Sequence, residues 1–154
     1  MNALRKAPQR AQRVRGVPGV GLRTADGTEW VKVGKVFAEI GGVDTIRVQS
    51  CTRPGRYGNP WRVVEVDGIW LAQAGAQAGV WWANDRECPF HQSRRSAVAA
   101  TIRQFRKLAR LWPDAMFHDL AQYDHLSCFC PLDQPCHVDA IIAEGARRGI
   151  WGGS

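Results

Sequence analysis

Apolar residues recur with a helical period in two stretches of the chain, residues 93–111 and 137–148. In the first, the apolar positions lie three or four residues apart and would share one helix face: Val98, Ile102, Phe105 and Ala109. Ser93 is a favourable N-cap, and Pro113 prevents this helix from continuing. The pattern therefore predicts two amphipathic helices, with a shorter one between them over residues 113–120.

Strand-like patterns occupy segments bounded by turn signals. Three segments are predicted to be single strands: residues 29–36, 44–50 and 125–130. Residues 61–66 and 69–71 flank Asp67-Gly68, a dipeptide that favours a type I′ turn, so they predict a short hairpin. Residues 72–89, which contain two adjacent tryptophans, fit either a loop or a short buried helix.

The first 27 residues show neither period and are rich in proline, glycine and basic side chains. Before Asp26 there is no acidic residue and there are six basic ones: Arg5, Lys6, Arg10, Arg13, Arg15 and Arg23. Such a segment is typical of a solvated tail or of a non-specific nucleic-acid contact. We expect residues 1–27 to form a basic, flexible N-terminal arm and residues 28–150 to form a single domain.

Strands that alternate with helices favour an α/β architecture. We expect a compact Rossmann-like layer of mostly parallel strands flanked by helices, with a short hairpin added. Ligands of such folds bind at the C-terminal edge of the strands. The strand over residues 125–130 would end there, beside the start of the last helix at Cys136 or His137.

Composition and charge narrow the class of protein. The 154 residues carry a formal net charge of +7, and no apolar run is long enough to span a membrane. No signal-peptide core is present and the five cysteines do not suggest a disulfide framework, so we expect a cytoplasmic location. The excess of arginine over lysine fits a phosphate-bearing partner, or simply a G+C-rich genome. The oligomeric state is left open.

Three cysteines and one histidine gather in residues 128–137. Together they form a set that zinc would accept: Cys128, Cys130, Cys136 and His137. The spacing argues against one shared metal, because C-x-C is tighter than the usual C-x2–4-C and two adjacent residues do not easily bind the same ion. The spacing also matches no common iron–sulfur pattern. Zinc is therefore one possibility and no cofactor is assigned.

A second interpretation makes this segment reactive. Cys136 precedes a helix, whose N-terminal dipole lowers the pKa of a thiol, and His137 could protonate a bound group. Asp139 completes the candidate catalytic set in the first turn. Cys128 and Cys130 fit equally well as small core residues on a buried strand.

A third interpretation is an anion site formed with the loop over residues 51–61. Backbone N–H groups at residues 136–139 would bind a phosphate, and Arg53 or Arg56 would clamp it. Asn59 would orient a base or ribose, and Trp61 would stack on a ring. The alternative for this proline- and glycine-rich loop is a purely structural turn.

Two motifs, RPGRYGNPW (residues 53–61) and LSCFCPLDQPCHVDAII (residues 126–142), together resemble a family of small bacterial and phage proteins known as domain of unknown function 4326. The helix start RRSAV (residues 94–98) also fits, and the resemblance covers residues 44–148. Phe129 stands where the family has tryptophan, and Val138 where it has a small residue. The resemblance implies a compact Rossmann-like domain and phage origin, without an agreed activity.

We therefore expect a nucleotide- or nucleic-acid-directed protein whose site lies between residues 53–61 and 128–139. Whether it catalyses a reaction, such as modification of a nucleotide or base, is left open. The catalytic candidates are Cys136, His137 and Asp139. The ligand- and phosphate-binding candidates are Arg53, Arg56, Asn59, Trp61, Cys128 and Cys130. Two alternatives remain, a non-catalytic nucleic-acid-binding module and a zinc-stabilised inhibitor that sequesters a host factor.

Overall fold

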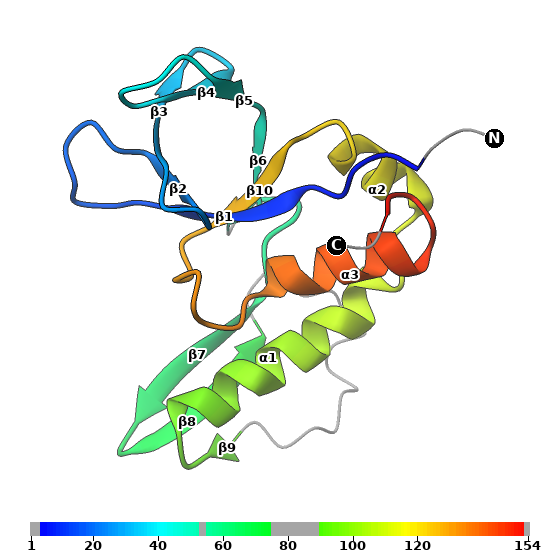
Figure 1. Cartoon of the computed structure of the whole chain (residues 1–154). Helices are drawn as coiled ribbons and strands as arrows, with labels where there is room; N and C mark the ends of the chain where they lie inside the picture. The colour runs from blue at the N-terminus through cyan, green and yellow to red at the C-terminus, as the bar shows by residue number, and fades with distance from the viewer. Residues whose placement is uncertain (1–3, 53–54, 75–89, 153–154) are drawn as a thin grey trace.

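A seven-stranded mixed sheet dominates the computed structural model, which describes residues 4–52, 55–74 and 90–152 (Figure 1). Its strands are, in spatial order, β5 (Thr45–Ile46), β4 (Val36–Glu39), β3 (Glu29–Val33), β2 (Leu22–Thr24), β1 (Gln9–Arg13), β10 (His125–Cys128) and β6 (Val48–Ser50). Two pairs of strands in this sheet are parallel, β10 with β1 and β10 with β6. Every other pair in the sheet is antiparallel.

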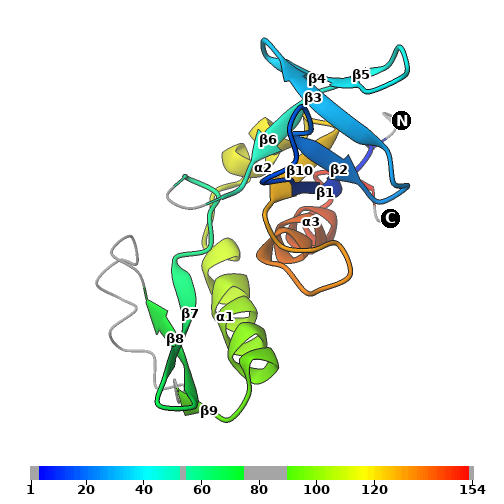
Figure 2. The same cartoon turned by 90° about the vertical axis from the view of Figure 1, so that its left-hand side faces the viewer.

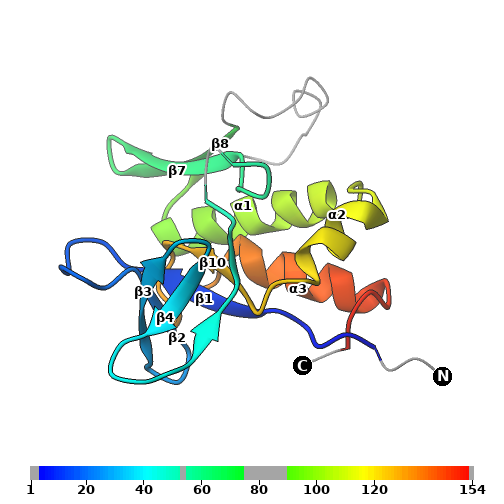
Figure 3. The same cartoon turned by 90° about the horizontal axis from the view of Figure 1, so that it is seen from above.

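The sheet curls until its two edges almost meet. The edge strands β5 and β6 are separated in the chain by Arg47 alone, so the sheet forms a nearly closed barrel (Figure 3). Each strand from β1 to β6 contributes one side chain to a common apolar cluster: Ala11, Leu22, Trp30, Phe37, Ile46 and Val48. The Trp30 indole N–H donates to Thr24 Oγ1 at 3.1 Å, which satisfies its polar group inside this cluster.

The expected Rossmann-like layer of mostly parallel strands is wrong. Parallel strands need long crossover connections, whereas β2 to β5 follow one another through tight turns. Three of these turns contain a glycine with positive φ, a conformation that residues with a Cβ rarely adopt: Gly27, Gly34 and Gly41. These short turns produce an antiparallel meander.

The expectation that residues 1–27 form a flexible arm is also wrong over much of this segment. β1 lies inside the sheet between β2 and β10, and Ala11 and Leu22 are fully buried. The chain ends meet as well, because Arg5 pairs with Trp151 in an isolated parallel bridge. The polar sequence of β1 hides its position, because β10, one of its two pairing partners, lies more than 100 residues away in the chain.

The described residues form three helices, α1 (Arg94–Ala109), α2 (Asp114–Leu120) and α3 (His137–Arg147), of which α3 packs against β1 and β10. α1 packs beside α3 and separates it from a second, antiparallel sheet of β7 (Trp61–Val66), β8 (Ile69–Ala74) and β9 (Phe90–His91) (Figure 2). The predicted helices and hairpin are therefore present. The Ser93 side chain caps α1, and Asp67 and Gly68 both have the positive φ of a type I′ turn. The adjacent tryptophans, Trp81 and Trp82, lie outside the described residues.

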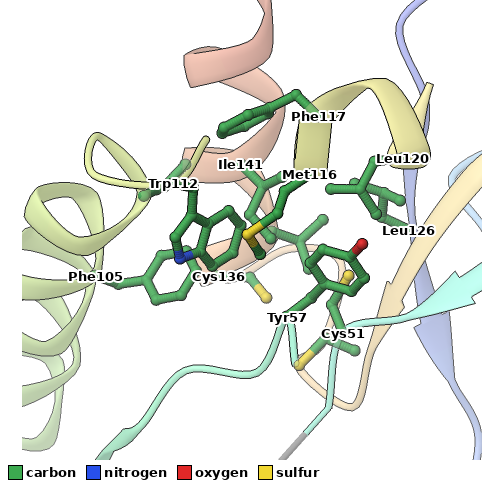
Figure 4. Close-up of a cluster of buried hydrophobic side chains, with 14 of the residues drawn as sticks. Cys51, Tyr57, Phe105, Trp112, Met116, Phe117, Leu120, Leu126, Cys136 and Ile141 are labelled. Atoms are coloured by element: carbon green, nitrogen blue, oxygen red, sulfur yellow. The ribbon is translucent and has the colours of Figure 1, made fainter. Parts of the chain in front are cut away.

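The main core lies between the helices and β10 (Figure 4). It includes Phe105 of α1, Phe117 of α2 and Ile141 of α3, all fully buried. Cys136 and Tyr57 lie at its border, where Figure 4 shows them close to Cys51. The start of α3 and the loop before β7 are therefore anchored to the same core.

Candidate metal centre and adjoining pocket

Three cysteines converge where β10 ends and α3 begins. Cys128 is the last residue of β10, Cys130 lies in the following loop, and Cys136 is the N-cap of α3. The three Sγ atoms lie within 4.8 Å of one another, and Cys128 and Cys130 are separated by 3.7 Å. Cys128 and Cys136 are buried, and Cys130 is partly exposed. This group could hold a metal ion, since thiolates are preferred ligands of zinc.

His137 extends the cysteine cluster. Its Nδ1 lies 3.6 Å from Cys136 Sγ and 3.9 Å from Cys128 Sγ. Its Nε2 lies 2.8 Å from the carbonyl oxygen of Cys51 and 3.2 Å from that of Tyr57. The ring also packs edge-on against Phe105, with centroids 4.9 Å apart. Two neighbours in sequence, Cys136 and His137, therefore do point at one place.

The thiols share protons unequally. Hydrogen bonds from Cys130 and then Cys136 lower the pKa of Cys128, because they stabilise its thiolate. The same bonds to Cys128 are the main cause that raises the pKa of Cys130 and of Cys136. Cys51 stands apart, because burial raises its pKa and makes it an ordinary core thiol. A thiolate at Cys128 is a ready first ligand for a metal.

An arginine from β1 holds the loop that carries these cysteines. Arg10 donates to the carbonyl oxygens of Pro131 and Gln134 and forms an ion pair with Asp139 at 2.9 Å. Its side chain is only 10% exposed, so these bonds replace the hydration of its two terminal nitrogens, whereas its buried Nε has no hydrogen-bond partner among the described residues. Since Arg10 lies on a strand, the loop is tied to the large sheet as well as to α3.

Asp139 belongs to this structural framework. Its carboxylate accepts a hydrogen bond from the Cys136 backbone N–H at 3.3 Å, so it caps α3 while it pairs with Arg10. It does not line the pocket described below. The N-terminus of α3, expected to bind an external phosphate, is thus capped by the chain's own carboxylate.

A pocket of about 410 Å³ adjoins the cysteine cluster. Its lining includes the four ligand candidates, Cys128, Cys130, Cys136 and His137, together with residues from the start of β7, from α1 and from the loop after β10. The residues of most chemical interest in its lining are Arg15, Thr52, Asn59, Trp61, Arg94 and Phe129. The predicted juxtaposition of the loop before β7 with residues 128–137 is present.

The residues predicted in the 53–61 loop have separate environments. Trp61 is buried and lines the pocket. Asn59 also lines it, but its side-chain oxygen accepts from the Trp61 backbone N–H at 3.0 Å, which shapes the loop. Arg56 faces away from this pocket and lies 3.8 Å from Asp119. Arg53 lies outside the described residues.

Sequence reasoning missed Arg15 and did not assign Arg94 to the site. Arg15 lies over the Phe129 ring, with its guanidinium carbon 3.6 Å from the ring centroid. Arg94 opens α1 and lines the other side of the pocket. The concentration of arginines before Asp26 was a signal for Arg15, but without the pairing of β1 with β10 its target could not be found.

Comparison with known proteins adds no relative. No family model, no curated protein and no solved structure matches the chain. The resemblance to domain of unknown function 4326 therefore stays a prediction based on the two motifs. Within the described residues, no helix has the length and apolar character needed to cross a membrane.

Proposed function

We propose that the protein binds a phosphate-bearing ligand of the nucleotide class in the pocket above the cysteine cluster, and that the cluster holds zinc. The observation that carries the proposal is the composition of this pocket. Its lining combines the basic side chains of Arg15 and Arg94, the aromatic side chains of Trp61 and Phe129, and the cysteine cluster. A volume of about 410 Å³ is within the usual range for small-molecule sites.

The two arginines are suited to the phosphate end of such a ligand. Within residues 4–52, 55–74 and 90–152, neither Arg15 nor Arg94 is part of an ion pair. The Phe129 ring holds the guanidinium of Arg15 from one side and leaves its N–H donors available. Trp61 offers an apolar surface for the ring of a base or a ribose.

Zinc is the metal that fits the donor set, because it binds thiolate and imidazole in tetrahedral sites. Zinc would make Cys136 and His137 ligands rather than a nucleophile and an acid. The proposal is therefore one of ligand binding, and nucleotide or base modification would need a reactive group supplied by the ligand or by another part of the pocket.

Calorimetric titration of the zinc-loaded protein with ADP tests the proposal. We expect binding that weakens at least 10-fold in Arg15→Ala and Arg94→Ala. Arg106→Ala is the matched control, since Arg106 is exposed on α1 and does not line the pocket. A ligand at 100 times its Kd also stabilises the fold by about 2.7 kcal/mol, which thermal unfolding can detect. The absence of any ADP effect at millimolar concentration would contradict the proposal.

A second candidate is nucleic-acid binding through the outer face of α1. Four basic side chains are exposed there: Arg103, Arg106, Lys107 and Arg110. A duplex oligonucleotide in the same titration separates the two functions. Binding that weakens steeply with salt and is lost in Arg106→Glu, yet persists in Arg15→Ala, would favour the helix surface over the pocket.

A further inference from the structure

The protonation of His137 follows from its surroundings. Both groups near Nε2 are carbonyl oxygens, of Cys51 at 2.8 Å and of Tyr57 at 3.2 Å. A carbonyl oxygen can only accept, so Nε2 carries the hydrogen. In the neutral ring Nδ1 then has a free lone pair, and this atom faces Cys128 and Cys136. A carbonyl that fixes the ring in this way is a common feature of histidines that bind metals.

The distances around Nδ1 match a tetrahedral centre. Zn–S bonds of about 2.3 Å and Zn–N bonds of about 2.05 Å place two sulfurs about 3.8 Å apart, and a sulfur and a nitrogen about 3.6 Å apart. The Cys128–Cys130 sulfur distance is 3.7 Å, and Nδ1 lies 3.6 Å from Cys136 and 3.9 Å from Cys128. Three of the donor distances therefore match, and the ring of His137 still has to move towards Cys130, because His137 is not among the donors that all lie within 4.8 Å of one another.

The backbone explains how adjacent residues can share a metal. Cys136 is an N-cap residue in extended conformation, with φ −145° and ψ 150°, whereas His137 is the first residue of α3. This change of conformation between the two residues brings both side chains to the same side. The spacing argument against a shared metal assumed a single regular backbone and is overcome here.

We propose that His137 Nδ1 is the fourth metal ligand, and that its Nε2–H couples metal binding to the shape of the ligand pocket. The coupling to the ligand pocket rests on the proposed function, whereas the assignment of the fourth ligand does not. The carbonyl groups that receive this hydrogen bond belong to Cys51 and Tyr57, and the chain around them supplies Thr52 and Asn59 to the pocket. A metal that fixes the imidazole therefore also fixes one pocket wall.

Cys51 is the alternative fourth ligand, and the geometry argues against it. Its thiol lies 3.8 Å from the carbonyl oxygen of Gln49, whereas Nδ1 of His137 lies 3.6 Å from Cys136 Sγ and 3.9 Å from Cys128 Sγ. Only its backbone carbonyl faces His137. Cys51→Ser leaves that carbonyl in place and is the matched control.

X-ray absorption of the zinc-loaded wild-type protein tests the ligand set without any mutation. We expect three sulfurs and one nitrogen around zinc. Four sulfurs, or three sulfurs with oxygen only, would overturn the assignment. In parallel, Co²⁺ titration of the metal-free protein should show at least 10-fold weaker binding in His137→Gln and unchanged binding in Cys51→Ser. Equal affinity of wild type and His137→Gln would also overturn it.

The coupling is tested by ADP titration of the wild-type protein with and without zinc. We expect the affinity for ADP to fall about 10-fold when zinc is removed. Equal affinity in both forms would refute the coupling and leave the proposed function intact. If ADP binds neither form, both the proposed function and the coupling fail, while the absorption and Co²⁺ results still decide whether His137 is a ligand.

Discussion

The two ends of α3 both bury polar side chains, but they satisfy them differently. At the C-terminal end, Glu144 and Arg148 are 7% and 12% exposed and lie 3.0 Å apart. Arg148 also donates to the backbone carbonyls of Ala109, Arg110 and Trp112. The guanidinium of Arg148 thus pairs with the carboxylate of Glu144 and with the carbonyl groups at the end of α1. These polar groups need no partner from outside the protein.

At the N-terminal end, the groups beside the Arg10–Asp139 pair are three thiols and an imidazole. Cys128, Cys130 and Cys136 can only share protons with each other and with Nδ1 of His137. These atoms are electron-pair donors, so a cation is the partner that stabilises all of them at once. The comparison teaches that burial alone does not mark a functional site. The proposed metal site rests instead on donor atoms that face one another beside a pocket.

Removal of zinc has the largest expected effect on this comparison. A free zinc concentration 1,000 times above its Kd contributes about 4 kcal/mol to the free energy of unfolding. Urea denaturation in zinc-buffered and chelator-containing solutions should show this difference in the wild type and none in Cys128→Ser. A wild-type stability that does not depend on zinc would remove the distinction between the two ends of α3.

Loss of Arg148 is expected to have the next largest effect. Arg148→Met leaves Glu144 buried without one of its partners and should lower the free energy of unfolding by about 3 kcal/mol. Arg147 is the matched control: it also pairs with Glu144 but is 59% exposed, so Arg147→Met should cost less than about 1 kcal/mol. Zinc content should stay the same in both, and zinc loss in Arg148→Met would show that the two ends are coupled.

The helices and the hairpin turn could be predicted from local sequence. The apolar stripe of α1, its Ser93 cap and the Asp67-Gly68 turn each depend on residues close together in the chain. The fold class could not be predicted in this way, because it depends on the pairing of strands that are far apart in the chain. β1 reads as polar, and its burial comes from β10 and from a loop that accepts the hydrogen bonds of Arg10.

The site shows the same division. Cys128, Cys130 and Cys136 were named together from the sequence, although their spacing argued against one shared metal, and the loop around Asn59 and Trp61 does border the same pocket. Arg15 could not be placed, because its approach to Phe129 depends on the pairing of β1 with β10. The side chains expected to do chemistry were partly those that shape the backbone, as Asp139 does.

Glu144 should give a further effect, visible in the acid limb of stability. Hydrogen bonds from Arg147 and Arg148 lower its pKa from 4.5 to about 2. Because the folded pKa lies below the ordinary value, the ionised carboxylate stabilises the fold above pH 4.5, and this contribution is lost as the pH falls towards 2. Glu144→Gln should therefore flatten the dependence of unfolding free energy on pH in this window.

The effects of the two ends of α3 can be measured separately, because different groups take up protons at each end. Zinc binding requires deprotonated thiols and is itself lost in acid, so the Glu144 comparison is made by urea denaturation of metal-free protein. Asp114→Asn is the control, since Asp114 also pairs with Arg148 but is 67% exposed. A Glu144→Gln acid limb parallel to that of the wild type would mean that the buried pair gains nothing from ionisation. The C-terminal end would then owe its stability to the hydrogen bonds of Arg148 with α1 alone.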